Sequence, residues 1–157
     1  MAIIPRNIAG KIDTALSALR RGSFIMIRDQ SQRAGFIRAA EFADYDLPEI
    51  PQLRKMTPSL CFTRQHVLSL MPNSTSSRTV FSLPANALTG AQIVGLSVGE
   101  AQLLPKNATF LPEHENSLVD LAIRVVKFAK LLPSALLYRL PISDVYQQDR
   151  IASANQI

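Results

Sequence analysis

The chain has 157 residues, which is the size of one domain and enough to bury a core without metal or disulfide staples. Hydrophobic residues make up 47% and charged residues 18%, so the chain is more apolar and less charged than an average globular domain. The net charge of +5 comes from 17 scattered Lys and Arg, with no nucleic-acid-binding signature beside them. This balance argues against nucleic-acid binding and suits a phosphorylated small molecule or an acidic partner.

The cysteine count and the hydropathy pattern limit the cellular context. One cysteine, Cys61, excludes an intramolecular disulfide and a Cys-rich zinc site. The first charge comes at Arg6 with no apolar segment behind it, which argues against a secretory signal. No window approaches the ~18 apolar residues that span a bilayer. We therefore expect a cytoplasmic protein without a membrane segment.

The first half of the chain alternates helical spacing with short apolar runs. In chain order it predicts a helix at 8–19, a strand at 24–27, a polar turn at 29–32, a strand at 35–40, a short helix at 47–56, a strand at 59–63 and two helical turns at 64–71. Gly22 is placed to end the first helix, because glycine readily adopts the left-handed conformation found at helix C-termini.

The second half contains the clearest helix and the least regular segment. It predicts a turn at 73–77, a strand at 79–83, a helix at 115–130, a strand at 134–142 and a polar tail at 143–157. The helix is clear because six apolar residues form one stripe along it. Segment 87–106 has no readable period, since Gly90, Gly95 and Gly99 interrupt it.

Four segments in a fixed order carry a resemblance to a known family. They are 15–28 (ALSALRRGSFIMIR), 29–41 (DQSQRAGFIRAAE), 60–71 with its cysteine, and 114–122 (HENSLVDLA) followed by Leu132-Pro133. Their order and spacing resemble those of 3,4-dihydroxy-2-butanone 4-phosphate synthases. Those enzymes use magnesium to convert ribulose 5-phosphate to formate and the four-carbon precursor of riboflavin.

The resemblance implies an architecture and an assembly. It implies one α/β (α+β) domain over residues 1–142, built on a mixed β-sheet flanked by helices, with an appended tail at 143–157. Family members form homodimers with active sites at the subunit contact. A homodimer that binds a sugar phosphate or another small anion is therefore expected.

The resemblance also assigns roles to individual positions. Asp29, Cys61 and His114 match catalytic positions of the family, and Arg33 matches a substrate-binding position. Glu41 and His114 are the candidate metal ligands. Mg²⁺ is expected as a cofactor only if the family's lyase activity is retained, and otherwise no cofactor is expected.

The chain departs from the family where its chemistry needs carboxylates. The run of glutamates that should follow Arg33 is missing, and Arg139 stands where a late strand should carry a glutamate. The family's phosphate-binding Asp-Arg-x-x-Thr segment has no counterpart near 100–104. Mg²⁺ requires hard oxygen ligands in near-octahedral geometry. The sequence therefore predicts a synthase-like domain that has lost most of its metal site and at most binds a sugar phosphate.

Two other functions stay open. The first is an active, divergent lyase in which Asp29, Glu41 and His114 organise the cation. The second is a non-enzymatic interaction or regulatory protein whose basic surface meets an acidic protein or RNA.

Each candidate residue also has a plain structural role to weigh. Asp29 suits a turn, because Asp hydrogen-bonds its own backbone two residues on. Arg33 suits a solvated surface position, and Cys61 suits a small buried apolar side chain. His114 lies between Glu113 and Glu115, which suits a local ion pair or a helix cap.

Overall fold

The computed structural model describes residues 6–44, 50–74 and 76–141, with side chains from residue 12 onward. In chain order its helices and strands are α1 (Arg6–Arg20), β1 (Ile25–Arg28), β2 (Ala34–Ala39), β3 (Ser59–Thr63), α2 (Arg64–Leu70), β4 (Val80–Pro84), α3 (Gly90–Ser97), β5 (Leu111–Glu113), α4 (Leu118–Phe128) and β6 (Ser134–Arg139). Three short 3-10 helices add η1 (Ala40–Phe42), η2 (Pro51–Lys55) and η3 (Ala101–Leu103).

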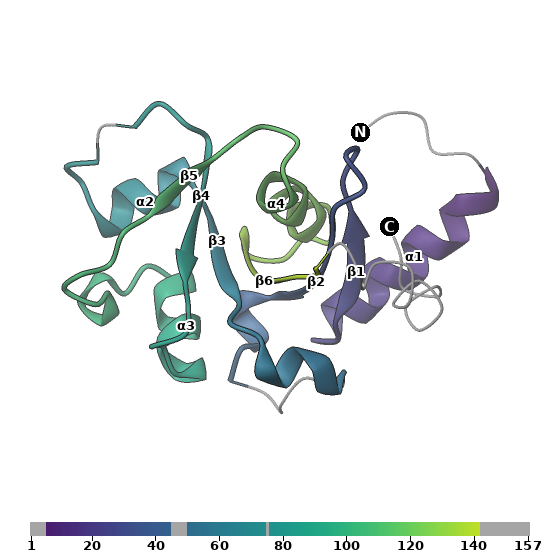
Figure 1. The fold of residues 1–157 in the computed structure, drawn as a ribbon, viewed down its shortest axis with the longest axis horizontal. Coiled ribbons are helices and arrows are strands. Elements are labelled where there is room, and N and C mark those ends of the chain that lie inside the picture. Colours follow the sequence, from purple (N-terminus) through teal and green to yellow (C-terminus); the bar gives the residue numbers. More distant parts are fainter. Residues whose placement is uncertain (1–5, 45–49, 75, 142–157) are drawn as a thin grey trace.

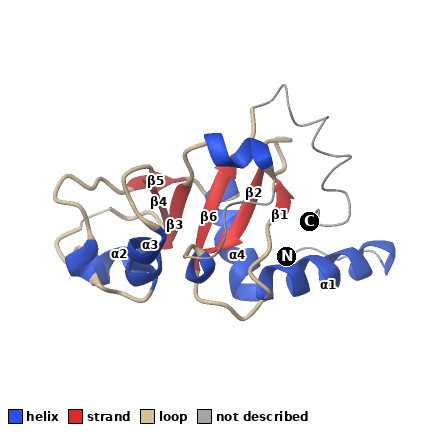
Figure 2. Cartoon of the chain, turned by 90° about the horizontal axis from the view of Figure 1, so that it is seen from below, coloured by secondary structure: helices blue, strands red, loops and turns tan. Residues whose placement is uncertain are grey.

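The described strands form one sheet in the order β1-β2-β6-β3-β4-β5. Figure 2 shows β5 and β1 at its two ends. The last strand, β6, lies between β2 and β3, with Leu137 opposite Ile37 and Ala135 opposite Cys61. Every described pair is antiparallel, so the predicted α+β class is confirmed, but the sheet is antiparallel rather than mixed. The sequence cannot give the direction of a strand that pairs with distant partners.

Along the strands other than β5, alternate residues enter two separate cores, one on each face of the sheet. In β6, Ala135 and Leu137 pack with α1 and α4, and we call this side the α4 face. Leu136 and Tyr138 pack on the other side with residues of α2, α3 and η2, and we call it the α3 face. This alternation follows from the two-residue period of a strand. In Figure 1, α2 and α3 lie beside the β4–β5 end of the sheet and α1 beside the β1 end.

Most of the predicted elements are present with nearby bounds. The first helix ends at Arg20, and Gly22 just past it has a φ of +85°, as its sequence position predicted. The short helix predicted at 47–56 is limited to η2 in the part that the structure describes, since 45–49 lie outside it. The predicted tail at 143–157 also lies outside the described residues. None of the described helices is long and apolar enough to cross a membrane.

The sequence did not predict α3 and β5. A capping box starts α3, in which Thr89 and Gln92 exchange side-chain and backbone hydrogen bonds at 3.1 and 2.8 Å. Gly90 is needed at its start, because a Cβ there would lie 2.5 Å from the carbonyl oxygen of Ala43. Strand β5 has only three residues and contains a proline, so its pairing with β4 comes from tertiary structure.

Candidate functional site

The loop between β1 and β2 holds the first candidate residues, Asp29 and Arg33. One carboxylate oxygen of Asp29 accepts the backbone N–H groups of Ser31 and Arg33, both at 2.9 Å. The other accepts from the Nε of Arg33 at 2.9 Å. Asp29 therefore both stabilises the turn and orients the side chain of Arg33. Its carboxylate is almost fully buried.

The N-terminal end of α4 lies next to this loop. Asp29 and Gln30 line a cavity of about 210 Å³ together with Asn116, Asp120 and Arg124. Asp120 accepts the backbone N–H of Asn116 at 2.8 Å and forms an ion pair with Arg124 at 2.9 Å. The structure thus brings Asp29 to the end of α4 that His114 precedes. The cavity contains cationic groups as well as these two carboxylates.

A second polar cluster lies on the α4 face around Cys61. Ser82 is opposite Cys61 in the β3–β4 pair, and its hydroxyl donates to Glu113 at 2.8 Å. Arg139 donates to the same Glu113 oxygen at 3.0 Å. Arg139 lies on the same face of β6 as Ala135, which pairs with Cys61. An arginine that is paired with Glu113 is therefore present at the position where the resemblance implies a glutamate.

The environment of Cys61 makes a poor nucleophile. Its side chain is fully buried, and burial raises the pKa of the thiol from 9.0 to about 12, with a lowering by Arg139 and a raising by Glu113 as smaller causes. The thiolate is the reactive form of cysteine, so a thiol that stays neutral at pH 7 is inert. These facts fit the structural role of Cys61 better than a catalytic one.

The two candidate metal ligands lie apart. Glu41 accepts the backbone N–H of Leu132, which follows α4, at 3.2 Å. His114 precedes α4 and lines an open cavity of about 480 Å³ with Arg78, Glu113 and other residues. The 11 residues of α4 span about 16 Å between these ends. The geometry gives no support to one ion shared by Glu41 and His114, and their metal role stays a prediction.

The donor set does not fit magnesium. No three His, Cys, Asp or Glu side chains among the described residues are grouped so that they could hold a metal ion. The carboxylates of Asp29, Glu113 and Asp120 each already accept from a neighbouring arginine. Mg²⁺ needs oxygen ligands that converge, and a paired guanidinium competes with the ion for the same oxygens.

The fold matches solved structures of 3,4-dihydroxy-2-butanone 4-phosphate synthases. The two-domain synthase RibBX from A. baumannii aligns with a TM-score of 0.62 at 12% identity, covering 93% of this chain and 54% of that chain. The synthase from Candida albicans aligns at 0.55 and 15% identity, covering 93% and 92%. A synthase in complex with two magnesium ions aligns at 0.55 and 13% identity, covering 82% and 74%.

These matches establish a shared fold at low sequence identity. This chain spans about half of the two-domain synthase, at 54% of its length. No family model matches the sequence, and no curated protein matches it in sequence. The chain is thus an α+β domain with the fold of these synthases, as the resemblance implied.

Sequence reasoning found Arg139 but missed its partners. Glu113 and Ser82 come from different strands and meet Arg139 only in the folded sheet. Ser82 gave one usable signal, since it is a polar residue inside the apolar run 80–83. The sequence around Glu113 gave no signal of this contact beyond its position before His114.

Proposed function

We propose that this protein is a synthase-like domain that binds a sugar phosphate on the α4 face without the turnover of a 3,4-dihydroxy-2-butanone 4-phosphate synthase. The observation that carries this proposal is the ion pair between Arg139 and Glu113 beside Cys61. It supplies a cation where synthase chemistry calls for a carboxylate. Enolate chemistry on a sugar phosphate needs a metal or positioned bases, whereas binding its phosphate needs N–H donors.

Three ion pairs between an arginine and a carboxylate share an arrangement that favours the binding of an anion. The side chains of Arg33, Arg124 and Arg139 are 58%, 57% and 44% exposed, while their carboxylate partners are 2%, 9% and 19% exposed. Each carboxylate is more shielded than its partner and orients an arginine that still reaches solvent. Arginine's planar N–H fork matches phosphate geometry.

The three arginines come from neighbouring elements, namely the loop before β2, helix α4 and the end of β6. Arg139 lies opposite Gly35, two residues after Arg33 in the chain. Arg124 lines the cavity that Asp29 shares. This clustering favours a single phosphate group as the ligand of that region.

The decisive experiment separates binding from turnover. Purified protein is incubated with ribulose 5-phosphate and Mg²⁺, and formate is measured beside an active synthase. We expect no formate above the blank, while ribulose 5-phosphate alone raises the melting temperature with a concentration dependence typical of native-state binding. Formate release at the rate of the active synthase would reject the proposal in favour of a divergent lyase.

Variants test the arginine cluster. Arg139→Gln is expected to weaken ribulose 5-phosphate binding tenfold or more, since each charge-assisted bond contributes roughly 1.5–3 kcal/mol. Lys127→Gln removes an exposed charge near the opposite end of α4 and is the matched control. Binding is also expected to be the same in EDTA as in Mg²⁺. If both variants bind as the wild type does, the cluster is not the site, and an interaction role becomes the better hypothesis.

We also propose a homodimer. Large apolar side chains are exposed at Val98, Leu111 and Phe128, and Leu111 lies on β5, the edge strand. Exposed apolar residues at a sheet edge suit a subunit contact. Light scattering is expected to give twice the 17.3 kDa of one chain. A concentration-independent mass of 17.3 kDa would contradict the dimer.

A further inference from the structure

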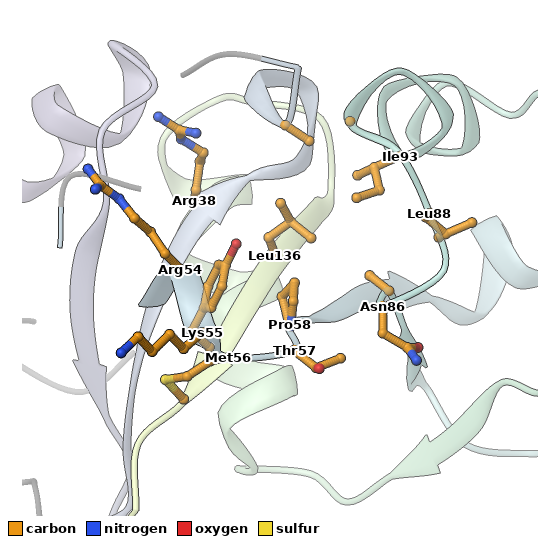
Figure 3. Close-up of a pocket in the computed structure, with 14 residues that line it drawn as sticks. Arg38, Arg54, Lys55, Met56, Thr57, Pro58, Asn86, Leu88, Ile93 and Leu136 are labelled. Atoms are coloured by element: carbon orange, nitrogen blue, oxygen red, sulfur yellow. The ribbon is translucent and has the colours of Figure 1, made fainter. Parts of the chain in front are cut away.

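A separate pocket lies on the α3 face, on the side of the sheet opposite Cys61. Leu136 and Tyr138 of β6 contribute to it, and η2 and the start of α3 form its walls. Its volume is about 470 Å³, within the range of small-molecule sites. Figure 3 shows basic side chains on one side of it and Leu88, Ile93 and Asn86 on the other. The pocket is therefore divided into a cationic part and a mostly apolar part.

The charged side chains among the described residues that line this pocket are all basic. Arg38, Arg54 and Lys55 line it, and none of its described lining residues is acidic. Asp44 follows the lining residue Ala43 but is exposed and does not line the pocket. Clefts lined by charges of one sign concentrate the field between their low-dielectric walls. Anions are the class of ligand that this arrangement attracts.

Arg38 is a buried residue of the pocket wall and not a surface residue. It is buried within β2, where a charged side chain is costly unless it is well partnered. Its Nε donates to the carbonyl of Gly22 at 2.7 Å, and its guanidinium lies 4.5 Å from the ring centroid of Phe24. These contacts hold the cation in place before any ligand arrives, which favours binding.

The other wall supplies apolar contact and neutral donors. Leu88 and Ile93 are partly and fully buried apolar residues, and Asn86 adds an exposed amide. Tyr138 adds a hydroxyl, and because burial raises the pKa of its phenol, that group stays a proton donor. A purely inorganic anion would leave this apolar wall without a partner.

We infer that the pocket on the α3 face binds an organic phosphate whose remaining part is planar or apolar. The phosphate would lie toward Arg38, Arg54 and Lys55, and the planar part toward Leu88 and Ile93. This site is independent of the sugar-phosphate site proposed on the α4 face, since the two lie on opposite faces of the sheet. Either proposal can fail without the other.

The test uses ADP as the probe, with pyrophosphate and adenosine as its separate halves. Calorimetry on the full chain is expected to show ADP binding at least tenfold tighter than either half, with an affinity that falls as salt rises. The double variant Arg54→Gln, Lys55→Gln is expected to weaken ADP binding tenfold or more. Both positions are exposed, so the fold should tolerate these changes.

Controls separate this pocket from general charge effects and from the other site. The double variant Arg64→Gln, Lys127→Gln removes the same charge at exposed positions elsewhere and should bind ADP as the wild type does. Arg139→Gln should also leave ADP binding unchanged. Methyl NMR on the wild type should show ADP-induced shifts at Leu88 and Ile93 even if a variant folds poorly. Absence of ADP binding at millimolar concentration, equal affinity for pyrophosphate, or unchanged methyl signals would overturn the inference.

Discussion

Two aspartates in this protein each accept hydrogen bonds from the backbone and also pair with an arginine side chain. Asp29 accepts two backbone N–H groups and the Nε of Arg33, and Asp120 accepts one backbone N–H and pairs with Arg124. A carboxylate held in this way has little freedom to take a proton from a substrate. Asp29, which matches a catalytic position of the resembled family, therefore orients an arginine in this structure.

Cys61 gives a prediction at the same scale. Its thiol has a pKa of about 12 in the fold against an ordinary 9.0, so as pH rises above 9 the unfolded chain loses this proton before the folded chain does. The free energy of unfolding should therefore fall, by about 1 kcal/mol per pH unit between pH 9 and 11, relative to Cys61→Ala. Denaturant titrations of both proteins across this range provide the measurement.

Thiol reactivity provides an independent check on Cys61. A chromogenic disulfide reagent at pH 8 should react with the denatured protein and hardly at all with the native one, because the side chain is fully buried. Rapid reaction of the native protein would contradict a structural role for this cysteine.

Helix α4 begins beside both candidate cavities, the one at Asp29 and the one at His114. The stripe of apolar residues predicted it at 115–130, and the structure has it at Leu118–Phe128. Its start is set by Ser117, whose side chain accepts the backbone N–H of Asp120 at 3.2 Å. Residues 114–116 precede this cap, and this frees them to face the Asp29 loop and the cavity at His114.

Removal of this cap should destabilise the fold. Ser117→Ala leaves the Asp120 N–H without its side-chain acceptor at a nearly buried position, so the free energy of unfolding should fall by about 1 kcal/mol. Ser69→Ala is the matched control, because Ser69 is exposed and only bonds back to the carbonyl of His66. Chemical denaturation measures both, and an equal loss in the two variants would argue against the cap.

The whole molecule depends on a sheet that is covered on both faces. Strand β6 arrives last in the chain and pairs with both β2 and β3, so the sheet closes only after residues 134–139 are in place. Its residues reach both cores. The match to synthases at TM-scores of 0.55 to 0.62 with 12–15% identity shows that very different sequences share this fold.

A core substitution in β6 tests this dependence. Leu137→Ala leaves a cavity between the sheet and its helices, and the free energy of unfolding should fall by about 2–5 kcal/mol. Leu132→Ala makes the same change at an exposed leucine five residues earlier and should alter stability by no more than about 0.5 kcal/mol. Thermal unfolding followed by circular dichroism compares them. A small effect of Leu137→Ala would mean that β6 is not central to the core.

Several parts of the fold and the site were predictable from local patterns. The helix α4, the strands β1 to β4 and the helix stop at Gly22 each follow from spacing or from one residue's backbone preference. The Asp29 turn follows from the chemistry of Asp. The α3 helix was hidden because Gly90 and Gly95 serve close approaches to Ala43 and Leu103, contacts that no local pattern reveals.

The sequence alone determined the class of fold, the absence of a glutamate run after Arg33 and the excess of positive charge, because these depend on composition, order and period. Tertiary structure decided that Arg139 meets Glu113 and that Arg38, Arg54 and Lys55 share one cavity. It also decided that Glu41 and His114 lie at opposite ends of α4. Such meetings between side chains depend on strand register and on the insertion of β6, which are set by the packing of residues far apart in the chain.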